Sequence, residues 1–224
     1  MSSSESPEPN SPAEARSQTE ARSQTEARSQ AEQSLSARAG AVLFRNRSWL
    51  PVPFLLVTLL VPSHANWYNW LVGLVVIVVG EWIRLAGVAV AGTVTRRRSR
   101  DVQRLVNYGA FGWVRNPLYV GNFLIWMGFV VISGVLWFLP VAIVIFMIEY
   151  SLIVAYEEGV LESIFGAEYL AYKQTTPRWI PRPPRERAEG PHSWAEAWRS
   201  EISTFMQYGA LIVVFAVKQK IWWA

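Results

Sequence analysis

The sequence predicts an all-α, polytopic membrane protein with about five transmembrane helices, a tight helical hairpin at its centre and a disordered N-terminal tail. Three observations carry this prediction. Of the 224 residues, 51% are hydrophobic and 17% are charged, a balance typical of membrane proteins. Several later runs hold no charged residue over long stretches. The first 40 residues, in contrast, are almost wholly polar.

The N-terminal segment, residues 1–40, is predicted to be the disordered tail. From residue 14 it repeats the hexapeptide Glu-Ala-Arg-Ser-Gln-Thr. Six residues turn a helix by about 600°, so the repeated arginines would spiral around the axis and form no common face. The segment has no apolar stretch near its start, so we do not expect it to be a secretory signal peptide.

The first two apolar runs differ in length. Residues 49–62 contain three prolines and are short for a bilayer core of about 30 Å, which needs about 20 helical residues, so they predict only a weak span. Residues 66–92 are long enough, and their only charges are Glu81 and Arg84. These two residues lie three apart on one helix face, where we expect them to form an ion pair.

The next apolar stretch is long enough for two helices. Residues 118–148 carry no charge, and the apolar character continues past Glu149 to Tyr156. At about 1.5 Å per residue, this length exceeds one crossing and fits two helices of about 18 residues each. Gly134 and Pro140 lie near the expected turn. The sequence therefore predicts a transmembrane hairpin.

The last apolar run, residues 205–217, is followed by Lys218 and Lys220. It either crosses the membrane with its lysines snorkelling or lies in the interface. Together these segments predict three parts of the chain: a polar tail (1–40), a membrane domain (41–183), and a connector with the last helix (184–224).

Positive charge gathers before the first span, between the second and third, and after the fourth. The positive-inside rule places these three segments in the cytoplasm. The arginines of residues 96–104 could bind a nucleic acid, but beside apolar spans juxtamembrane charge explains them better, so no nucleic-acid partner is expected. The chain has no cysteine and two histidines. Disulfides, thiolate chemistry and a histidine-rich metal site are thus excluded, and the absence of cysteine suits a bacterial inner membrane.

The predicted hairpin brings two helix ends to one membrane face. Its first helix opens at the Arg-Asn-Pro sequence of residues 115–117, where asparagine is a favoured N-cap and proline a favoured first-turn residue. Its second helix ends at the pair Glu157-Glu158. A helix start attracts anions and two carboxylates attract a cation, so a zwitterion would suit the pocket between them. Simple capping and anchoring is the alternative explanation. Three aromatic residues offer faces for a cation or an adenine ring: Phe111, Trp113 and Tyr119.

Three segments together resemble the isoprenylcysteine carboxyl methyltransferases and their relatives, the membrane phospholipid N-methyltransferases. QRLVNYGAFGWVRNPLYVGN, residues 103–122, resembles the family's Arg-His-Pro-x-Tyr-x-Gly element and the segment before it. EEGVLESIFGAEYLAYKQTTPRWIP, residues 157–181, resembles its Glu-Glu pair and Phe-Gly-x-x-Tyr-x-x-Tyr ending. GEWIRLAG, residues 80–87, resembles a Gly-Glu-x-x-Arg stretch. The resemblance covers about residues 72–183. It is specific because the three segments occur in the same order and spacing around a hairpin as in the family.

The resemblance implies a membrane-embedded enzyme that binds S-adenosylmethionine at the cytoplasmic face. Its acceptor would be a lipid or another amphiphilic small molecule that arrives from the bilayer, and whether oxygen, nitrogen or sulfur is methylated stays open, as does the oligomeric state. The residues that match the family's cofactor-binding positions are Gln103, Arg104, Leu105, Val106, Phe111, Asn116, Pro117, Leu118, Tyr119 and Glu157.

Two departures from the family pattern bear on the acceptor. The motif histidine is Asn116 here, which forms hydrogen bonds but does not titrate near neutral pH. In prenylcysteine methyltransferases an arginine contacts the carboxylate of the substrate, and Ile153 occupies the corresponding substrate position in this chain. A substrate with a carboxylate is therefore disfavoured.

An amine acceptor must lose a proton before it can be methylated, and Glu158 or Glu149 is the candidate catalytic base. Glu149 and Tyr156 lie seven residues apart and share a helix face, so both are expected to point toward a substrate cleft. Packing is the alternative role for each of them.

Two other functions compete with methyl transfer. One is an NADPH-dependent membrane reductase of the steroid reductase type, because those proteins also carry an Asn/His-Pro-x-Tyr-x-Gly element before a hairpin. The other is a non-enzymatic membrane scaffold whose tail recruits a partner, in which case deleting residues 1–38 would abolish function.

Overall fold

The computed structural model describes residues 35–92, 104–184 and 188–223, and every regular element within these ranges is a helix. Residues 35–45 are helical. The helices that follow, in chain order, are α2 (Pro51–Leu60), α3 (Trp67–Ala91), α4 (Ala110–Trp113), α5 (Pro117–Ser133), α6 (Phe138–Phe165), α7 (Ala167–Thr175) and α8 (Trp194–Trp223). The all-α prediction is confirmed. Residues 35–40, which the sequence assigned to the tail, belong to a helix; residues 1–34 lie outside the described ranges.

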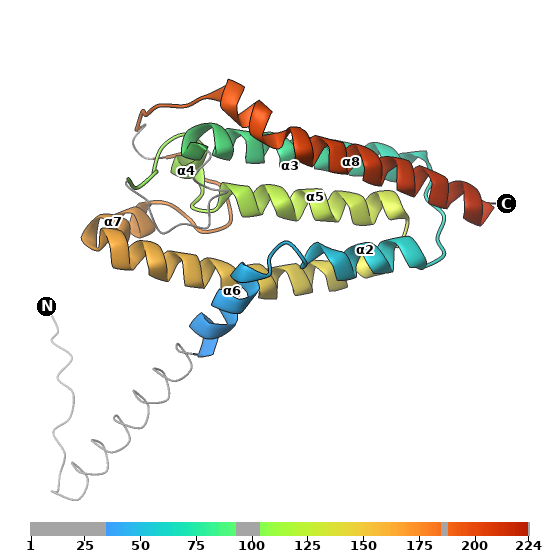
Figure 1. Ribbon diagram of the computed structural model, residues 1–224, viewed down its shortest axis with the longest axis horizontal. Coiled ribbons are helices and arrows are strands. Elements are labelled where there is room, and N and C mark those ends of the chain that lie inside the picture. The colour runs from blue at the N-terminus through green and yellow to red at the C-terminus, as the bar shows by residue number, and fades with distance from the viewer. Residues whose placement is uncertain (1–34, 93–103, 185–187, 224) are drawn as a thin grey trace, which may run out of the picture.

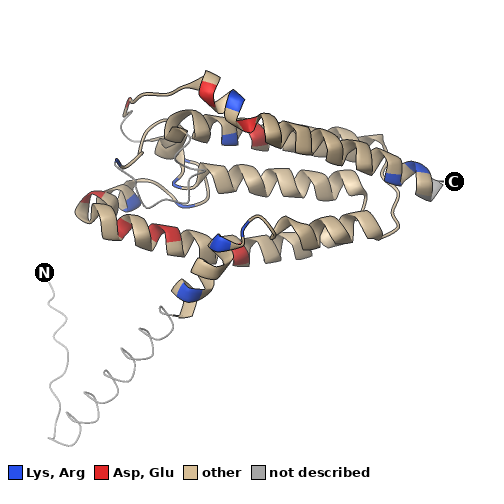
Figure 2. Cartoon of the chain, viewed as in Figure 1, with Lys and Arg blue, Asp and Glu red and all other residues tan. Residues whose placement is uncertain are grey.

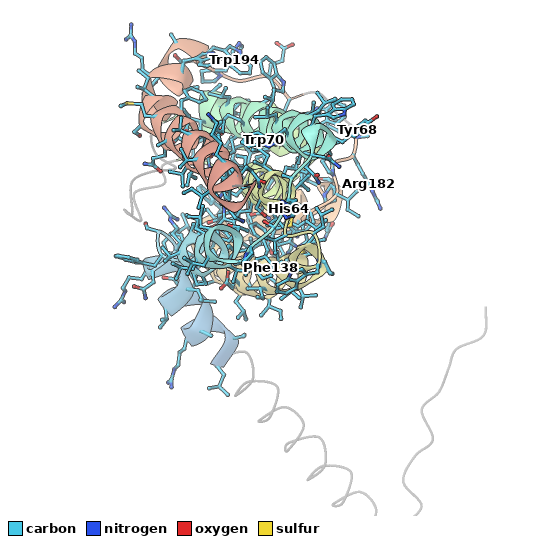
Figure 3. All side chains as sticks on the ribbon, turned by 90° about the vertical axis from the view of Figure 1, so that its right-hand side faces the viewer. His64, Tyr68, Trp70, Phe138, Arg182 and Trp194 are labelled. Atoms are coloured by element: carbon cyan, nitrogen blue, oxygen red, sulfur yellow. The ribbon has the colours of Figure 1, made fainter. Side chains whose placement is uncertain are left out.

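The five longer helices form an elongated bundle with α5 in the middle (Figure 1). Seen along the bundle, α3 and α8 lie on one side of α5, and α2 and α6 lie on the other (Figure 3). The starts of α5 and α8 and the ends of α3 and α6 meet at one end of the bundle, together with α4 and α7. This end is called the α4/α7 end below. The turn between α5 and α6 lies at the opposite end.

Three helices are long and apolar enough to cross a membrane: Trp67–Ala91, Phe138–Phe165 and Trp194–Ile221. Large apolar side chains on their outer faces are exposed, as expected for surfaces that contact lipid, with Val78 of α3, Ile148 of α6 and Val213 of α8 all more than half exposed. Two shorter apolar helices, α2 and α5, complete the predicted set of five. The chain is therefore an integral membrane protein.

The weak span predicted over residues 49–62 is a helix of only ten residues, α2. At about 1.5 Å per residue it extends about 15 Å, roughly half of a bilayer core. The second predicted span, residues 66–92, is confirmed by α3, Trp67–Ala91. Asn66 and Asn69 form a reciprocal capping box that fixes the start of this helix. Gly92 ends that helix with a positive φ of 65°.

The central hairpin turns at a glycine, as predicted. Gly134 has a φ of 77°, the left-handed conformation that favours glycine, and it ends α5 after Ser133. A Cβ atom at this position would lie 2.7 Å from the carbonyl oxygen of His64, so the site requires glycine for space as well. Pro140 does not form the turn: it lies in the first turn of α6, where proline needs no helical partner for its nitrogen.

Helices α3 and α5 approach each other closely through facing glycines. A Cβ atom added at Gly80 would lie 2.7 Å from the carbonyl oxygen of Gly121, and one added at Gly128 would lie 2.8 Å from that of Gly73. Gly73 and Gly80 are seven residues apart, as are Gly121 and Gly128, so each pair occupies one face of its helix. Small residues of this kind let transmembrane helices pack backbone against backbone.

Replacing Gly80 with alanine is expected to lower the melting temperature of the purified protein in detergent. The new Cβ meets backbone rather than a flexible side chain, and overpacking of this kind costs about 1–3 kcal/mol. Gly159→Ala on α6 is the matched control, since nothing lies within 4 Å of its added Cβ. Equal melting temperatures for the two variants would contradict the close α3–α5 approach.

The end of α8 is anchored by a buried lysine. Lys218 is 5% exposed, and its Nζ donates to the Thr58 carbonyl oxygen at 2.6 Å and to Ser63 Oγ at 2.8 Å. The helical donor to that carbonyl would be residue 62, which is a proline without an N–H. Lys218 thus replaces a missing helical hydrogen bond and does not snorkel, contrary to one of the two predicted arrangements.

Candidate functional site

A cavity of about 1540 Å³ lies among the helices and includes residues of α4 and α7 in its lining. It is lined by residues of every described helix and reaches along the bundle as far as Thr58 of α2 and Val130 of α5. Pockets for single small ligands are typically about 300–1,000 Å³, so this cavity has room for more than one small molecule. Figure 2 shows that charged residues gather toward the α4/α7 end of the bundle.

Glu158 joins the start of α5 to α6, as predicted, but α6 does not end at the glutamate pair: it continues to Phe165. Its Oε1 accepts a hydrogen bond from Nε of Arg115 at 3.0 Å, across 43 residues of sequence. The guanidinium of Arg178 donates to both carboxylate oxygens of Glu158. Arg115 also donates to the carbonyl oxygen of Thr176 at 2.7 Å. The predicted proximity of residues 115–117 to the Glu157-Glu158 pair is therefore confirmed.

These contacts argue against Glu158 as the catalytic base. Glu158 is 3% exposed, and both of its carboxylate oxygens already accept hydrogen bonds from guanidinium groups. A base needs a free oxygen within reach of the proton that it removes. The structure instead gives Glu158 a positioning role, because it holds the loop after α7 against the start of α5.

Glu157 faces a different direction from its neighbour, since successive helical residues are about 100° apart. It lines the cavity, and its closest charged partner is Arg47, with Nη1 3.7 Å from Oε1. The Tyr119 hydroxyl also faces this carboxylate. Arg47 itself lies over the Phe44 ring, 4.3 Å from its centroid. Glu157 is thus a carboxylate at the cavity wall that can bind a cation.

The start of α5 differs in one detail from the prediction. Asn116 occupies the N-cap position and Pro117 the first helical position, as expected. The Asn116 side chain makes no capping hydrogen bond, however; its Nδ2 donates to the carbonyl oxygen of Arg178 at 3.3 Å. The side-chain amide bonds to this loop instead of capping the helix, because the loop that contains Arg178 lies directly against the start of α5. Asn116 therefore binds α5 to the same loop as Glu158.

Most of the predicted cofactor-binding residues lie around the cavity. Those that line it are Arg104, Leu105, Val106, Phe111, Asn116, Pro117, Leu118, Tyr119 and Glu157. Gln103 lies outside the described residues. The predicted substrate residue Tyr156 also lines the cavity, and its ring packs against Phe44 with centroids 5.7 Å apart. Their roles in binding stay predictions.

Two predicted residues are not brought to the cavity. Ile153 is fully buried in an apolar core that includes Phe146 and Tyr150, and it does not line the cavity. Glu149 does not line it either, although Tyr156, seven residues further along the same face of α6, does. The structure therefore offers neither residue a contact with a ligand in the cavity.

Hydrogen bonds hold α4 and the loop before it at the rim of the cavity. The Tyr172 hydroxyl of α7 donates to the Phe111 carbonyl oxygen at 2.7 Å, and the Tyr108 hydroxyl donates to that of Pro191 at 3.1 Å. Burial raises the pKa of the Tyr169 and Tyr172 phenols above their ordinary values. Both therefore stay neutral near pH 7, so Tyr172 keeps its proton to donate.

A second polar cluster lies on the α3 and α8 side of the cavity, which all of its residues except Glu81 line, and the sequence analysis identified only part of it. The expected ion pair is confirmed, with Arg84 Nε 3.3 Å from Glu81 Oε2. Arg84 also donates to the Asn122 side-chain oxygen of α5 and, at 3.0 Å, to Glu201 Oε2 of α8. Tyr208 of α8 interacts with Glu81 and Arg84. These five residues are called the Arg84 cluster.

The central part of the chain matches a known protein family. Residues 68–168 match the model of a family described as phospholipid methyltransferase. This range contains α3 except its first residue, all of α4, α5 and α6, and the first two residues of α7. No group of three or more histidine and acidic side chains within the described ranges is placed to hold a metal ion.

Curated proteins similar to the chain share one printed description. A "probable protein-S-isoprenylcysteine O-methyltransferase" of Oryza sativa subsp. indica is 34% identical over 123 residues, which are 51% of this chain and 62% of the relative. Protein-S-isoprenylcysteine O-methyltransferase A of Arabidopsis thaliana is 32% identical over 124 residues, 52% and 61% of the two chains. The Homo sapiens enzyme is 32% identical over 127 residues, 50% and 42% of the two chains.

The chain therefore spans less than two thirds of the length of these relatives. No solved structure matches it. The residues before α3 and the whole of α8 lie outside the matched family range.

Proposed function

We propose that the chain is a membrane-embedded methyltransferase that uses S-adenosylmethionine, because residues 68–168 match the phospholipid methyltransferase family. The acceptor is a lipid or another apolar small molecule that enters from the bilayer. The single observation that carries the proposal is the junction of the Arg-Asn-Pro start of α5 with the end of α6 beside a large cavity.

The residues around the cavity fit this cofactor chemically. S-adenosylmethionine supplies a methyl group on a positively charged sulfur, and its amino acid part is a zwitterion. Glu157 at the cavity wall suits the cationic groups. The start of α5 suits the carboxylate, since the first amides of a helix lack helical partners. Phe111 and Tyr119 offer aromatic surface for the adenine ring.

The cavity has a second, apolar part that suits an acceptor chain. Its walls beyond the Arg84 cluster are formed by apolar side chains of α5 and α8: Ile125, Trp126, Phe129, Val130 and Leu211. Such walls exclude water, and two ligands held side by side react faster than ligands that meet in solution. The protein's contribution is therefore to position donor and acceptor and to keep the site dry.

We place the cavity mouth at the cytoplasmic face. The α4/α7 end carries Arg104, Arg115, Arg178 and Arg182, and the positive-inside rule assigns such segments to the cytoplasm. A bacterial inner membrane stays a prediction from composition, while the relatives named above come from plants and an animal.

Two binding measurements separate this function from a reductase. We expect S-adenosylhomocysteine to raise the melting temperature of the purified protein in detergent, and NADPH to leave it unchanged. A rise with NADPH alone would end the methyltransferase proposal. The acceptor is then identified by mass spectrometry of membrane lipids from cells with and without the protein, fed with labelled methionine, as a species heavier by one labelled methyl group.

A further inference from the structure

The apolar part of the cavity ends inside the bundle. Three helices line this part, and on each of them the lining stops before the helix does: at Thr58 of α2, at Val130 of α5 and at Leu211 of α8. Thr58 and Val130 are both buried. These three residues are called the end wall below.

Packed and hydrogen-bonded side chains lie behind the end wall. Phe215, one turn after Leu211 on α8, is fully buried in an apolar cluster against which Leu59 of α2 packs. Lys218 follows on the same face of α8 and donates to the Thr58 carbonyl oxygen at 2.6 Å. The face of α8 that lines the cavity therefore continues into a contact with the end of α2, and this contact supports the end wall.

The position of the end wall limits the length of a chain that the cavity can hold. Asn122, in the Arg84 cluster, and Val130 are eight residues apart on α5. This separation is about 12 Å at about 1.5 Å per residue. One leaflet of a bilayer core is about 15 Å thick, half of about 30 Å. A chain long enough to cross a leaflet would thus meet the end wall, and packed interiors resist the insertion of further methylene groups.

We propose that the end wall selects acceptors by chain length, so that the cavity holds an apolar chain shorter than the acyl chains of the surrounding bilayer. Leu211 is the specificity-determining residue, because its side chain forms part of the wall and can be resized without breaking a hydrogen bond. It belongs to α8, which follows the matched residues 68–168. This assignment rests on the proposed function and names the length of its acceptor.

The test is a competition among linear alcohols that differ only in chain length. Purified protein in digitonin, whose apolar part is a steroid ring system rather than an alkyl chain, receives equal amounts of octanol, decanol, dodecanol, tetradecanol and hexadecanol. Native mass spectrometry then resolves the retained alcohols by mass in one spectrum. We expect wild-type protein to retain roughly tenfold less hexadecanol than decanol, the effect of leaving about two methylene groups unburied.

Two substitutions of Leu211 are expected to shift this preference in opposite directions. Leu211→Trp fills the end of the cavity and favours octanol over decanol, whereas Leu211→Ala lengthens the cavity and favours dodecanol and tetradecanol. A merely structural role would not produce opposite shifts. Val213→Trp and Val213→Ala are the matched controls, because Val213 is 61% exposed on the outer face of α8, and both keep the wild-type preference.

Equal retention of hexadecanol and decanol by the wild type overturns the assignment, since the chain would then leave the cavity sideways into lipid. Retention of no alcohol, or one preference shared by both Leu211 variants, overturns it as well. Binding of S-adenosylhomocysteine is measured on the same samples. If the preference shifts with Leu211 while S-adenosylhomocysteine does not bind, the end wall stands and the proposed methyltransferase function fails.

Discussion

Glu158→Gln is expected to lower the free energy of unfolding by about 3–5 kcal/mol, the cost of removing one partner from a buried ion pair. Glu158 is the shared acceptor of Arg115 and Arg178, and a glutamine amide carries no charge and only one accepting oxygen. Two guanidinium groups would then lose their common counter-charge at the junction of α5, α6 and the loop after α7. The part of this cost that involves Arg178 is moderated by solvent, because that side chain is 37% exposed.

The melting temperature in detergent measures this loss, and a fall of roughly 10 °C is expected from the size of the domain. Glu162→Gln is the matched control one turn further along α6. Its partner Lys173 lies 2.9 Å away, but both side chains are about a third or more exposed, so this pair contributes little. If the two variants unfold at the same temperature, Glu158 does not hold the junction together.

Glu157→Gln is expected to weaken S-adenosylhomocysteine binding by about thirtyfold, roughly 2 kcal/mol, with little change in melting temperature. The carboxylate lines the cavity with one distant ion-pair partner, Arg47, so its charge is available to a bound cation. Glutamine keeps the size of the side chain and removes that charge. Equilibrium binding to purified protein gives the affinity.

The adjacent glutamates thus separate two roles on one turn of helix. We expect loss of Glu157 to change ligand affinity and loss of Glu158 to change stability. Glu162→Gln again serves as control, because it makes the same chemical change on α6 outside the cavity. Unchanged affinity in Glu157→Gln would remove this residue from the cofactor site.

The elements that the sequence predicted well are those set by local chemistry. The asparagine capping box starts α3, and the left-handed Gly134 ends α5, so both boundaries follow from residues close in sequence. The junction of Arg115 with Glu158 was also predictable, since antiparallel helices of a short hairpin must return to the same face. The Glu81–Arg84 pair follows from helical spacing.

The elements that were missed depend on contacts distant in sequence. Helix α8 begins at Trp194, whereas the predicted apolar run began at residue 205. The apolar pattern did not reveal the first turns of this helix because they carry charged residues. Glu201 reaches Arg84 across 117 residues, and no local pattern indicates such a pair. In the sequence alone Lys218 looks like a snorkelling residue. Its buried role depends on the Thr58 carbonyl oxygen of α2, which lies 160 residues away in the chain. One overlooked signal was present: the glycines of α3 recur every seven residues, which predicts a closely packed helix face.

The central claim is that the start of α5 and the end of α6 enclose the methyl donor. A structure determined with bound S-adenosylhomocysteine in lipid nanodiscs tests it most directly. We expect the ligand's amino group beside Glu157, its carboxylate at the first turn of α5, and its adenine ring among the side chains of residues 104–111. A nucleoside bound elsewhere, or the two helix ends on opposite sides of the bilayer, would contradict the proposal.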